Sequence, residues 1–458
     1  MTVTAIAGIV MIALIFVTLA FGFPIGLSIG LGSAAALFII MPNQGFLTIS
    51  AQKMFQSVNS FSLLAIPFFV LAGNIMNTGG IARRLVGCAK LVAHRLPGAL
   101  AQTNIVANML FGAMSGSGVA AAVAMGGILG PMEKEDGYSD EYIAVCNIAS
   151  GPTGMMIPPS NIMIVYSTVA GSVSIAALFM AGYIPGILWG LGCMIVAGVM
   201  AKKRGYVNTE KYNAKIVLKT LWDGIPSLLM IVIVIGGILG GIFTATEGSA
   251  IAVLYSLILS FIYRNITVKD LPKVIWSSVK TTAVIEYLVC VSGIMGYVMS
   301  YTHIPALVAN AILGFTTNKY VILLIMNVIL LIVGCFMDPT PAVLIFTPIF
   351  LPIVQTWGMS PVHFGLMMVM NLCVGTLTPP VGAILFAGCR VHQVKIEQII
   401  KMLLPFFAVI LICLSLLTYV PWLSMCIPQA LYHRGAEKRV PYPGPLSARY
   451  RAGCLLPC

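Results

Sequence analysis

Apolar runs of membrane-spanning length alternate with short polar loops along most of the chain. A helix needs about 20 mostly apolar residues to cross a bilayer core of ~30 Å, because each residue adds about 1.5 Å. The stretches that meet this requirement lie at about 4–21, 24–41, 61–78, 175–200, 225–242, 245–262, 282–299 and 396–421. Weaker stretches, expected to form short arms, lie at about 46–58, 83–92, 267–279 and 304–313.

Two longer blocks, 98–130 and 319–351, do not have the pattern of a single span. Each consists of two apolar arms around a polar tip, Ser115-Gly116-Ser117-Gly118 in the first and Asp338-Pro339-Thr340-Pro341 in the second. An arm of about 15 residues is too short to cross a ~30 Å core. We therefore expect two re-entrant hairpins, each entering and leaving the membrane on one side.

A proline pair interrupts each of two further apolar stretches. Pro158-Pro159 lies within 142–172, and Pro379-Pro380 lies within 363–393. Such a pair removes two backbone donors and blocks the preceding turn, so each helix is expected to break. In lipid, a broken helix persists only where protein or a water-filled cavity satisfies its freed polar groups.

The two proline pairs are 379 − 158 = 221 residues apart, and this offset relates the spans, arms and hairpins of residues 1–215 to those of 216–425. Residues that recur at this offset are Pro131 and Pro352, Gly137 and Gly358, Ser139 and Ser360, and Gly154 and Gly375. Each half then has about five crossings and one hairpin, and an odd number of crossings inverts the second half. The predicted fold is an all-α inverted structural repeat of about ten crossings and two hairpins, with breaks placed as at a transporter's central binding site.

Composition supports a polytopic membrane protein. Of 458 residues, 59% are hydrophobic and only 8% charged, whereas about 25% are charged in soluble proteins. The net charge of +12 comes from short loops on one side of the predicted topology, such as Lys202-Lys203-Arg204. This places that side in the cytoplasm and argues against nucleic-acid binding. The first apolar stretch is too long for a signal peptide, and the 11 cysteines have no metal-binding spacing.

The end of the chain differs from the rest. Residues 431–458 are basic, proline-rich and without hydrophobic periodicity, and they follow the last apolar run directly. The predicted topology places them outside, opposite the basic loops. We expect this tail to be non-native or disordered, either a cloning remnant or a frame-shifted end.

The tips and breaks offer oxygen ligands. The first half supplies the tip hydroxyls and the carbonyls of Gly151-Pro152-Thr153-Gly154, and the second supplies Asp338, Thr340 and the carbonyls of Gly375 to Pro380. Oxygen ligands suit a hard cation such as Na⁺ and do not suit a transition metal. The half-helix that starts at Ser160 and Asn161 favours an anionic group of a substrate.

Acidic residues inside the membrane are costly and therefore candidates for function. Asp338 is the best of these, because it lies at a hairpin tip. Glu286 has no basic residue within one turn, and it is either protonated, paired with another helix or in contact with a partner subunit. Glu247 is expected to cap a helix N-terminus. The acidic loop is expected to be a solvated turn, with Glu133, Glu135, Asp136, Asp140 and Glu141. The histidines are expected to be structural or interfacial.

Five passages resemble the large membrane subunit of tripartite ATP-independent periplasmic (TRAP) transporters. They are SGSGVAAAVAMGGILGPM (115–132), GPTGMMIPPSNIMIVY (151–166), GIFTATEGSA (241–250), FMDPTPAVLIFTPIFLPI (336–353) and HFGLMMVMNLCVGTLTPPVGAILF (363–386). The resemblance covers about residues 1–425. It implies an elevator-type transporter of the ion-transporter superfamily in the bacterial inner membrane. It also implies Na⁺-coupled import of an organic acid with a small membrane subunit, not fused to this chain, and a periplasmic substrate-binding protein.

The family motifs also imply site residues. One Na⁺ site would involve Ser115, Ser117, Gly151, Gly154, Ile157 and Pro158. A second would involve Asp338, Thr340, Gly375 and Thr378. The substrate would lie between the tips, near Ser117, Ser160, Asn161 and Pro380.

Two other readings compete with this one. A stand-alone Na⁺/dicarboxylate-type symporter of the same superfamily would share the repeat and the breaks but would need no binding protein. An intramembrane protease would need paired aspartates, a Ser-His pair or a His-Glu-x-x-His helix, and none is placed suitably in this sequence. We therefore expect a transporter and not an enzyme, of a substrate that the sequence does not identify.

Overall fold

The computed structural model describes residues 3–42, 45–171, 173–206, 214–379 and 382–435, and all regular secondary structure in these ranges is helical. The first half contains α1 (Val3–Ala20), α2 (Ile25–Ile40), α3 (Gly45–Val58), the 3₁₀ turn η1 (Phe61–Leu64), α4 (Ala65–Thr78), α5 (Ile81–Ala93), α6 (Ala99–Ser115), α7 (Gly118–Glu135), α8 (Asp140–Ser150), α9 (Thr153–Met156), α10 (Asn161–Val169) and α11 (Ile175–Arg204).

The second half contains α12 (Ala214–Leu239), α13 (Ala245–Ile262), α14 (Leu271–Tyr301), α15 (Ile304–Phe315), α16 (Lys319–Phe336), α17 (Pro339–Gln355), α18 (Pro361–Gly375), α19 (Ala383–His392), α20 (Ile396–Tyr419) and α21 (Trp422–Gly435). Of the predicted tail, residues 431–435 end α21, and residues 436–458 lie outside the described part of the chain.

The described helices include 8 that are long and apolar enough to cross a membrane, so the chain is a multi-pass membrane protein. They correspond to α1, η1 with α4, α11, most of α12, α13, α14, α16 and α20. Two predicted lengths differ from the structure. The predicted span 24–41 is the 16-residue α2, and the predicted hairpin arm α16 has 18 residues, so its length alone permits a crossing.

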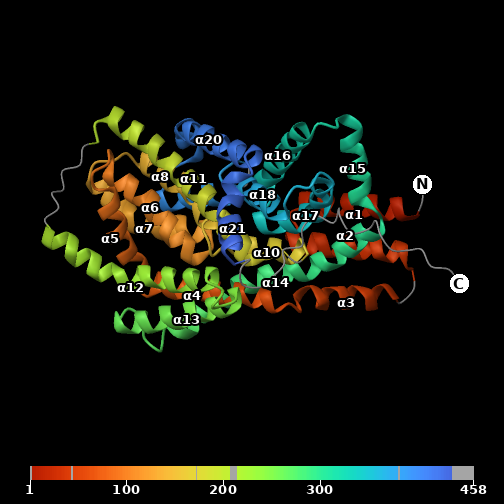
Figure 1. Cartoon of the computed structure of the whole chain (residues 1–458), viewed down its shortest axis with the longest axis horizontal. Helices are drawn as coiled ribbons and strands as arrows, with labels where there is room; N and C mark the ends of the chain where they lie inside the picture. The colour runs from red at the N-terminus through yellow and green to blue at the C-terminus, as the bar shows by residue number, and fades with distance from the viewer. Residues whose placement is uncertain (1–2, 43–44, 172, 207–213, 380–381, 436–458) are drawn as a thin grey trace.

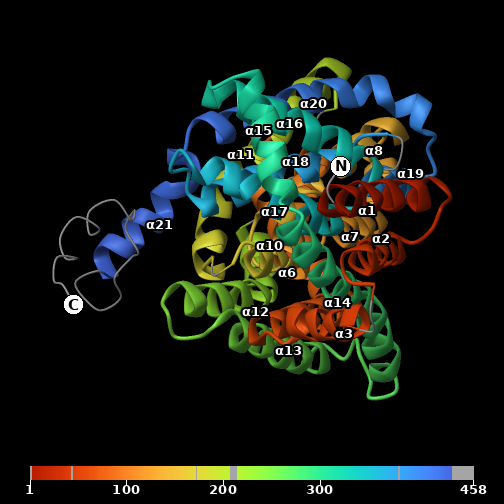
Figure 2. The same cartoon turned by 90° about the vertical axis from the view of Figure 1, so that its right-hand side faces the viewer.

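The helices form a central bundle with a layer along one side of it. The central bundle consists of the helix pairs α6–α7 and α16–α17 and the broken helices α8–α10 and α18–α19 (Figure 1). The flanking layer consists of α3, α4, α12, α13 and α14, which lie together along one face in both views (Figures 1 and 2). In α18, every residue from Val362 to Gly375 is buried, as expected for a mostly apolar helix in the interior.

The two halves exchange elements within the central bundle. The second arm of the first pair, α7, packs against α19 of the second broken helix, and α17 packs against α10 of the first broken helix. Each half therefore completes its packing only against the other half.

Glycines let the helices of the bundle approach to backbone contact. A methyl group at Gly154 would lie 2.3 Å from Gly112 Cα, and one at Gly375 would lie 2.5 Å from Gly334 Cα. In each half the first arm thus crosses its own broken helix at a glycine pair. Gly154 and Gly375 are also one of the residue pairs related by the 221-residue offset.

The flanking layer differs between the halves. In the first half, α3 ends at Val58, and Ser60 is extended (φ −130, ψ 124) before η1 and α4 begin. In the second half, α14 runs through the equivalent position without a break. The first half has Asn59 and Ser60 at this point and the second has Lys280 and Thr281. Asn and Ser side chains compete for backbone hydrogen bonds and favour helix ends.

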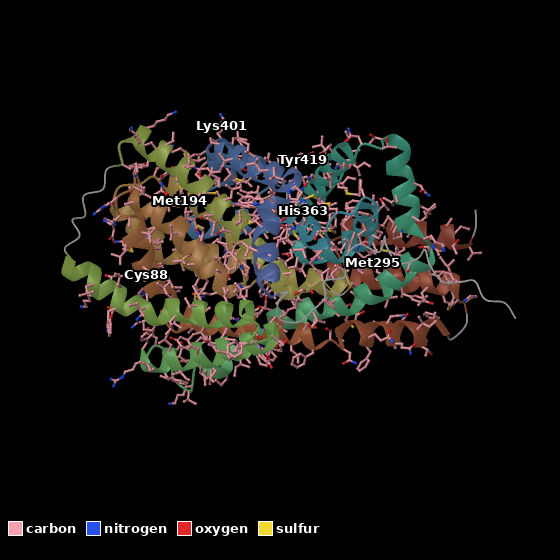
Figure 3. The ribbon with its side chains drawn as sticks, in the orientation of Figure 1. Cys88, Met194, Met295, His363, Lys401 and Tyr419 are labelled. Carbon is pink, nitrogen blue, oxygen red and sulfur yellow. The ribbon has the colours of Figure 1, made fainter. Side chains whose placement is uncertain are left out.

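Polar side chains in the interior are held by specific partners. His363, labelled near the centre of Figure 3, is 2% exposed, and its Nδ1 lies 2.7 Å from Ser424 Oγ, which joins α18 to α21. His392 is equally buried and lies beside Asn147 of α8.

Candidate functional site

The two tips of the central bundle are built alike. Ser117 caps α7 by accepting a hydrogen bond from the Ala120 N–H at 3.3 Å, and Asp338 caps α17 by accepting one from the Thr340 N–H at 3.3 Å. Ser117 and Asp338 are 338 − 117 = 221 residues apart. A helix N-terminus carries partial positive charge, so each tip presents an environment that attracts anions.

Both tips open into one cavity of about 800 Å³, which we call the tip cavity. Its polar residues from the central bundle are Ser115, Ser117, Asn161, Asp338, Thr340 and Thr376. The structure thus brings together both tips, the start of α10 after the first break and the end of α18 before the second.

The flanking layer and α2 form the opposite wall of the tip cavity. Gly26 lies at the start of α2, Asn74 and Asn77 lie near the end of α4, Thr281 lies in the first half of α14, and Tyr287 lies at its middle. Asn74 Nδ2 donates to Ser278 Oγ at 2.8 Å, so this wall is itself tied together between α4 and α14. The part of the wall at Asn74 and Asn77 lies at the end of α4 that precedes Arg83 and Arg84.

The residues expected for the first ion site separate into two groups. Ser115 and Ser117 line the tip cavity, and the Ser115 hydroxyl donates to the Ser117 carbonyl at 3.4 Å. The other members of this set do not line it and lie buried behind the tip; they are Gly151, Gly154, Ile157 and Pro158.

The residues expected for the second ion site separate in the same way. Asp338 and Thr340 line the tip cavity, and the Asp338 side chain is accessible within it. Gly375 and Thr378 do not line it, whereas Thr376, between them, does. The Thr376 carbonyl accepts hydrogen bonds from the N–H groups at the start of α19, at 3.1 and 3.3 Å. The Thr376 carbonyl therefore caps the N-terminus of α19, which has no side-chain cap.

Of the residues expected to bind substrate, Ser117 and Asn161 line the tip cavity. Asn161 is 9% exposed, and its Oδ1 has no hydrogen-bond partner among the described residues. Ser160 is fully buried, and its hydroxyl donates to the Met155 carbonyl at 2.6 Å, so it holds the break together and does not face the cavity. Pro380 lies outside the described residues.

Sequence reasoning missed Asn74 and Asn77 as cavity residues, and it included Thr376 only as part of the break from Gly375 to Pro380. The two asparagines are polar positions within a predicted span, and this contrast with their apolar neighbours was the available clue. Glu247 was predicted correctly: it forms a capping box with Thr244, whose N–H donates to its carboxylate at 2.8 Å. Glu286 is partly exposed on α14, and it forms no hydrogen bond or ion pair with another described residue, so the expected alternative of a pair with another helix is not observed in the described part of the chain.

The acidic loop was predicted wrongly at one position. Glu133 is fully buried and accepts a hydrogen bond from Asn104 Nδ2 at 3.2 Å, so it does not belong to a solvated turn. Because α7 continues to Glu135, Glu133 is part of this helix, and its side chain faces α6. Lys134 and Asp140 do form a partly exposed ion pair at 2.9 Å.

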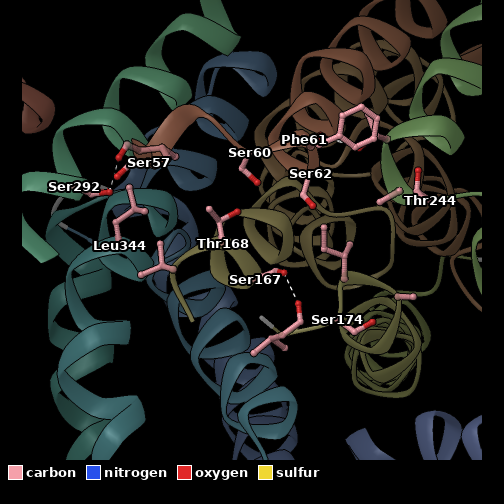
Figure 4. Close-up of a pocket in the computed structure, with 18 of the residues that line it drawn as sticks. Ser57, Ser60, Phe61, Ser62, Ser167, Thr168, Ser174, Thr244, Ser292 and Leu344 are labelled. Atoms are coloured by element: carbon pink, nitrogen blue, oxygen red, sulfur yellow. Dashed lines mark hydrogen bonds between the residues drawn. The ribbon is translucent and has the colours of Figure 1, made fainter. Parts of the chain in front are cut away.

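A second cavity, of about 870 Å³, lies between the central bundle and the flanking layer (Figure 4). Its lining is rich in hydroxyl groups and has no charged side chain among the described residues; we call it the hydroxyl cavity. Its hydroxyl residues from α3 to η1 are Ser57, Ser60 and Ser62, those around the α10–α11 loop are Ser167, Thr168 and Ser174, and those of α12–α14 are Thr244, Thr246 and Ser292. It adjoins the helix ends opposite those that line the tip cavity.

A multi-pass helical chain whose broken helices and polar tips surround an internal cavity has the architecture of a membrane transport protein. Two solved structures share this fold. The chain resembles the Alcanivorax borkumensis YdaH transporter, with a TM-score of 0.63, 15% identity and coverage of 84% of this chain and 90% of that one. It also resembles Neisseria gonorrhoeae MtrF, with a TM-score of 0.54, 12% identity and coverage of 81% and 83%.

Residues 12–423 match the family model of the tripartite ATP-independent periplasmic transporter, DctM component, and the chain belongs to this family. It is 51% identical over 412 residues to the uncharacterized protein YgiK of Salmonella typhimurium, covering 90% of this chain and 95% of YgiK. It is 42% identical to the isethionate TRAP transporter permease protein DctMQ of Oleidesulfovibrio alaskensis, covering 88% of this chain and 64% of that longer one. It is 34% identical to the sialic acid TRAP transporter large permease protein SiaM of Vibrio cholerae, covering 89% and 95%.

Proposed function

We propose that this chain carries out Na⁺-coupled import of a small organic acid anion across the bacterial inner membrane, as the large subunit of a binding-protein-dependent transporter. The observation that carries this proposal is the tip cavity, in which hydroxyls, one carboxylate and two helix N-termini meet at paired helix breaks. Cation ligands and anion-attracting groups at one place suit the joint binding of a cation and an acid.

We place the first inverted repeat in residues 1–215 and the second in 216–425. The equivalent caps Ser117 and Asp338, the paired glycine crossings and the exchange of α7 and α17 support the repeat. Opposite orientation follows from an odd number of crossings in each half. The basic loops put the connections after α4, α11, α13 and α19 in the cytoplasm.

In this arrangement the central bundle is the moving transport domain of an elevator, and the flanking layer is its scaffold. The tip cavity is walled by Asn77 of α4 and Thr281 of α14, which lie towards the cytoplasmic ends of those helices. The hydroxyl cavity lies towards the opposite ends, at Thr244 and Ser292. These positions support a conformation that faces the cytoplasm.

Two Na⁺ ions are assigned to the tip cavity and the breaks behind it. The first would use Ser115 and Ser117 with the carbonyls of Gly151 to Pro158, and the second would use Asp338 and Thr340 with the carbonyls of Gly375 to Thr378. The second site alone has a carboxylate, so it is the one in which the ion's charge is balanced by the protein. The organic acid would bind beside Ser117 and Asn161.

The class of substrate and the partners follow from the relatives. The named relatives transport isethionate, sialic acid and C4-dicarboxylates, which are all small organic acids. The family name states a tripartite system, so we propose a small membrane subunit and a periplasmic binding protein as partners.

Reconstitution into liposomes with both partners tests the proposal, with an inward Na⁺ gradient and labelled isethionate, sialic acid or a C4-dicarboxylate as the probe. We expect uptake of one of these acids that requires Na⁺ and the binding protein. Asp338→Ala should reduce Na⁺-dependent uptake strongly without preventing membrane insertion, whereas Asp270→Ala, on an exposed loop, should not. Unchanged Na⁺ dependence in Asp338→Ala would contradict the second site, and uptake by this chain with Na⁺ alone would favour the stand-alone symporter.

A further inference from the structure

Asn147 of α8 is the centre of a buried polar junction in the central bundle. Its side chain is fully buried, and both its amide nitrogen and its amide oxygen have partners on neighbouring helices. Asn147 Nδ2 donates to the Ala122 carbonyl of α7 at 2.8 Å and contacts His392 Nε2 of α19 at 3.0 Å. Asn147 Oδ1 accepts from Asn108 Nδ2 of α6 at 2.9 Å. One amide therefore joins four helices.

The geometry determines the role of His392. The Ala122 carbonyl can only accept, so the amide nitrogen of Asn147 must be the group that faces it. The second N–H of that nitrogen then points to His392 Nε2, which must accept. An imidazole nitrogen accepts only when it carries no proton, so His392 is neutral with its proton on Nδ1.

Two glycines of α7 leave room for the side chains of Asn147 and His392. A methyl group at Gly126 of α7 would lie 2.5 Å from Asn147 Nδ2 and 2.9 Å from His392 Nε2, and one at Gly130 would lie 3.1 Å from the His392 ring. Side chains at these positions would push the imidazole away from the amide. Gly127, the next residue along α7, has no atom within 4 Å of such a methyl group and is a matched control.

The second half has a different contact at the equivalent place. There α10 meets α18 through Tyr166, whose hydroxyl donates to the Pro361 carbonyl at 2.6 Å and whose ring lies against Gly365. The position 221 residues after Asn147 is Met368, which has no amide. The Asn147–His392 contact between α8 and α19 thus has no counterpart between α18 and α10, and it is not a consequence of the repeat.

The junction connects the two breaks. Asn147 lies one turn before the first break, and its carbonyl accepts from the Gly151 N–H at 3.0 Å. The helix α19 begins beside the tip cavity at Ala383 and ends at His392. A change at His392 therefore moves the half-helix whose other end borders the tip cavity.

We propose that His392 is a positioning residue, which holds α19 against α8 and α7 through its hydrogen bond from Asn147 and so sets the spacing of the two breaks. The expected effect of His392 on substrate binding rests on the proposed transport function. Its role in holding α19 against α8 and α7 does not. Loss of one such bond changes an equilibrium by roughly two- to tenfold.

Hydrogen exchange of the full chain in lipid nanodiscs tests the holding of α19 without any substrate. His392→Leu replaces the imidazole by an apolar side chain of similar bulk and so removes the acceptor, and α19 should then exchange roughly two- to tenfold faster. Gly126→Ala should have the same effect. His392→Gln, which restores an acceptor, and Gly127→Ala should leave exchange as in the wild type. Unchanged exchange in His392→Leu, or no recovery in His392→Gln, overturns the proposal.

Uptake in the reconstituted three-component system supplies the second readout. In His392→Leu, the substrate concentration for half-maximal uptake should rise by roughly two- to tenfold, with a smaller change in maximal rate per folded transporter. A purely structural role would lower the amount of folded protein and leave this concentration unchanged, which would also overturn the proposal. Absence of uptake by the wild type would reject the proposed function and leave the exchange result to decide on His392.

Discussion

The crossing of α6 over α9 at Gly112 and Gly154 allows a sharp test of the bundle, because its two closest atoms belong to the backbone. A methyl group at Gly154 would lie 2.3 Å from Gly112 Cα, whereas carbon atoms pack at about 3.5–4.0 Å. Gly154→Ala must therefore open the crossing by roughly 1.2–1.7 Å. Neither partner has a flexible side chain that could move aside.

The expected cost is about 1–3 kcal/mol, as for other overpacked interiors. Each kcal/mol lowers the midpoint by about 2–4 °C in domains of 150–250 residues, so we expect an apparent Tm lower by roughly 2–12 °C. The assay is thermal unfolding of the purified chain in detergent. Gly236→Ala on α12 is the control, since nothing lies within 4 Å of its added methyl group. If Gly154→Ala unfolds at the same temperature as Gly236→Ala, the close crossing does not exist.

Three further predictions concern other parts of the molecule. Asn371→Leu leaves Asn327 Oδ1 without the donor that now lies at 2.7 Å, which should cost about 1–3 kcal/mol and lower the apparent Tm; an unchanged Tm would show that the bond is not formed. Ser292 lines the hydroxyl cavity and Thr281 lines the tip cavity, which the proposed orientation puts towards the outside and the cytoplasm, respectively. Ser292→Cys should therefore react with a membrane-impermeant thiol reagent added to right-side-out vesicles, and Thr281→Cys should react only in inside-out vesicles. The reverse pattern would reject the proposed orientation. Hydrogen bonds from the Thr267 hydroxyl and N–H lower the pKa of Asp270, so its stabilising effect is complete above the ordinary pKa of about 3.9 and is lost as the pH falls through the lowered value. The Tm difference between the wild type and Asp270→Asn should therefore vanish at low pH, and a difference that persists there would contradict this origin.

Much of the fold was predictable because it depends on local properties. Span lengths follow from runs of apolar residues, and the breaks follow from proline pairs that no helix accommodates. The offset of 221 residues links Ser117 with Asp338, and both are helix caps at tips of the central bundle. The sequence also predicted the tip-cavity residues that lie at the two tips themselves, including Ser115 and Thr340.

The sequence by itself determined that this protein is a helical membrane protein with two polar tips and two helix breaks, because these properties depend on each segment's own residues. Only the tertiary structure decided which segments meet. It brings Asn147 and His392, 245 residues apart, to 3.0 Å, and it buries Glu133 beside Asn104. It also walls the tip cavity with Asn74 and Asn77. Such contacts depend on how α7 and α19 pack across the two halves, and packing between distant segments leaves no periodic trace in a single sequence.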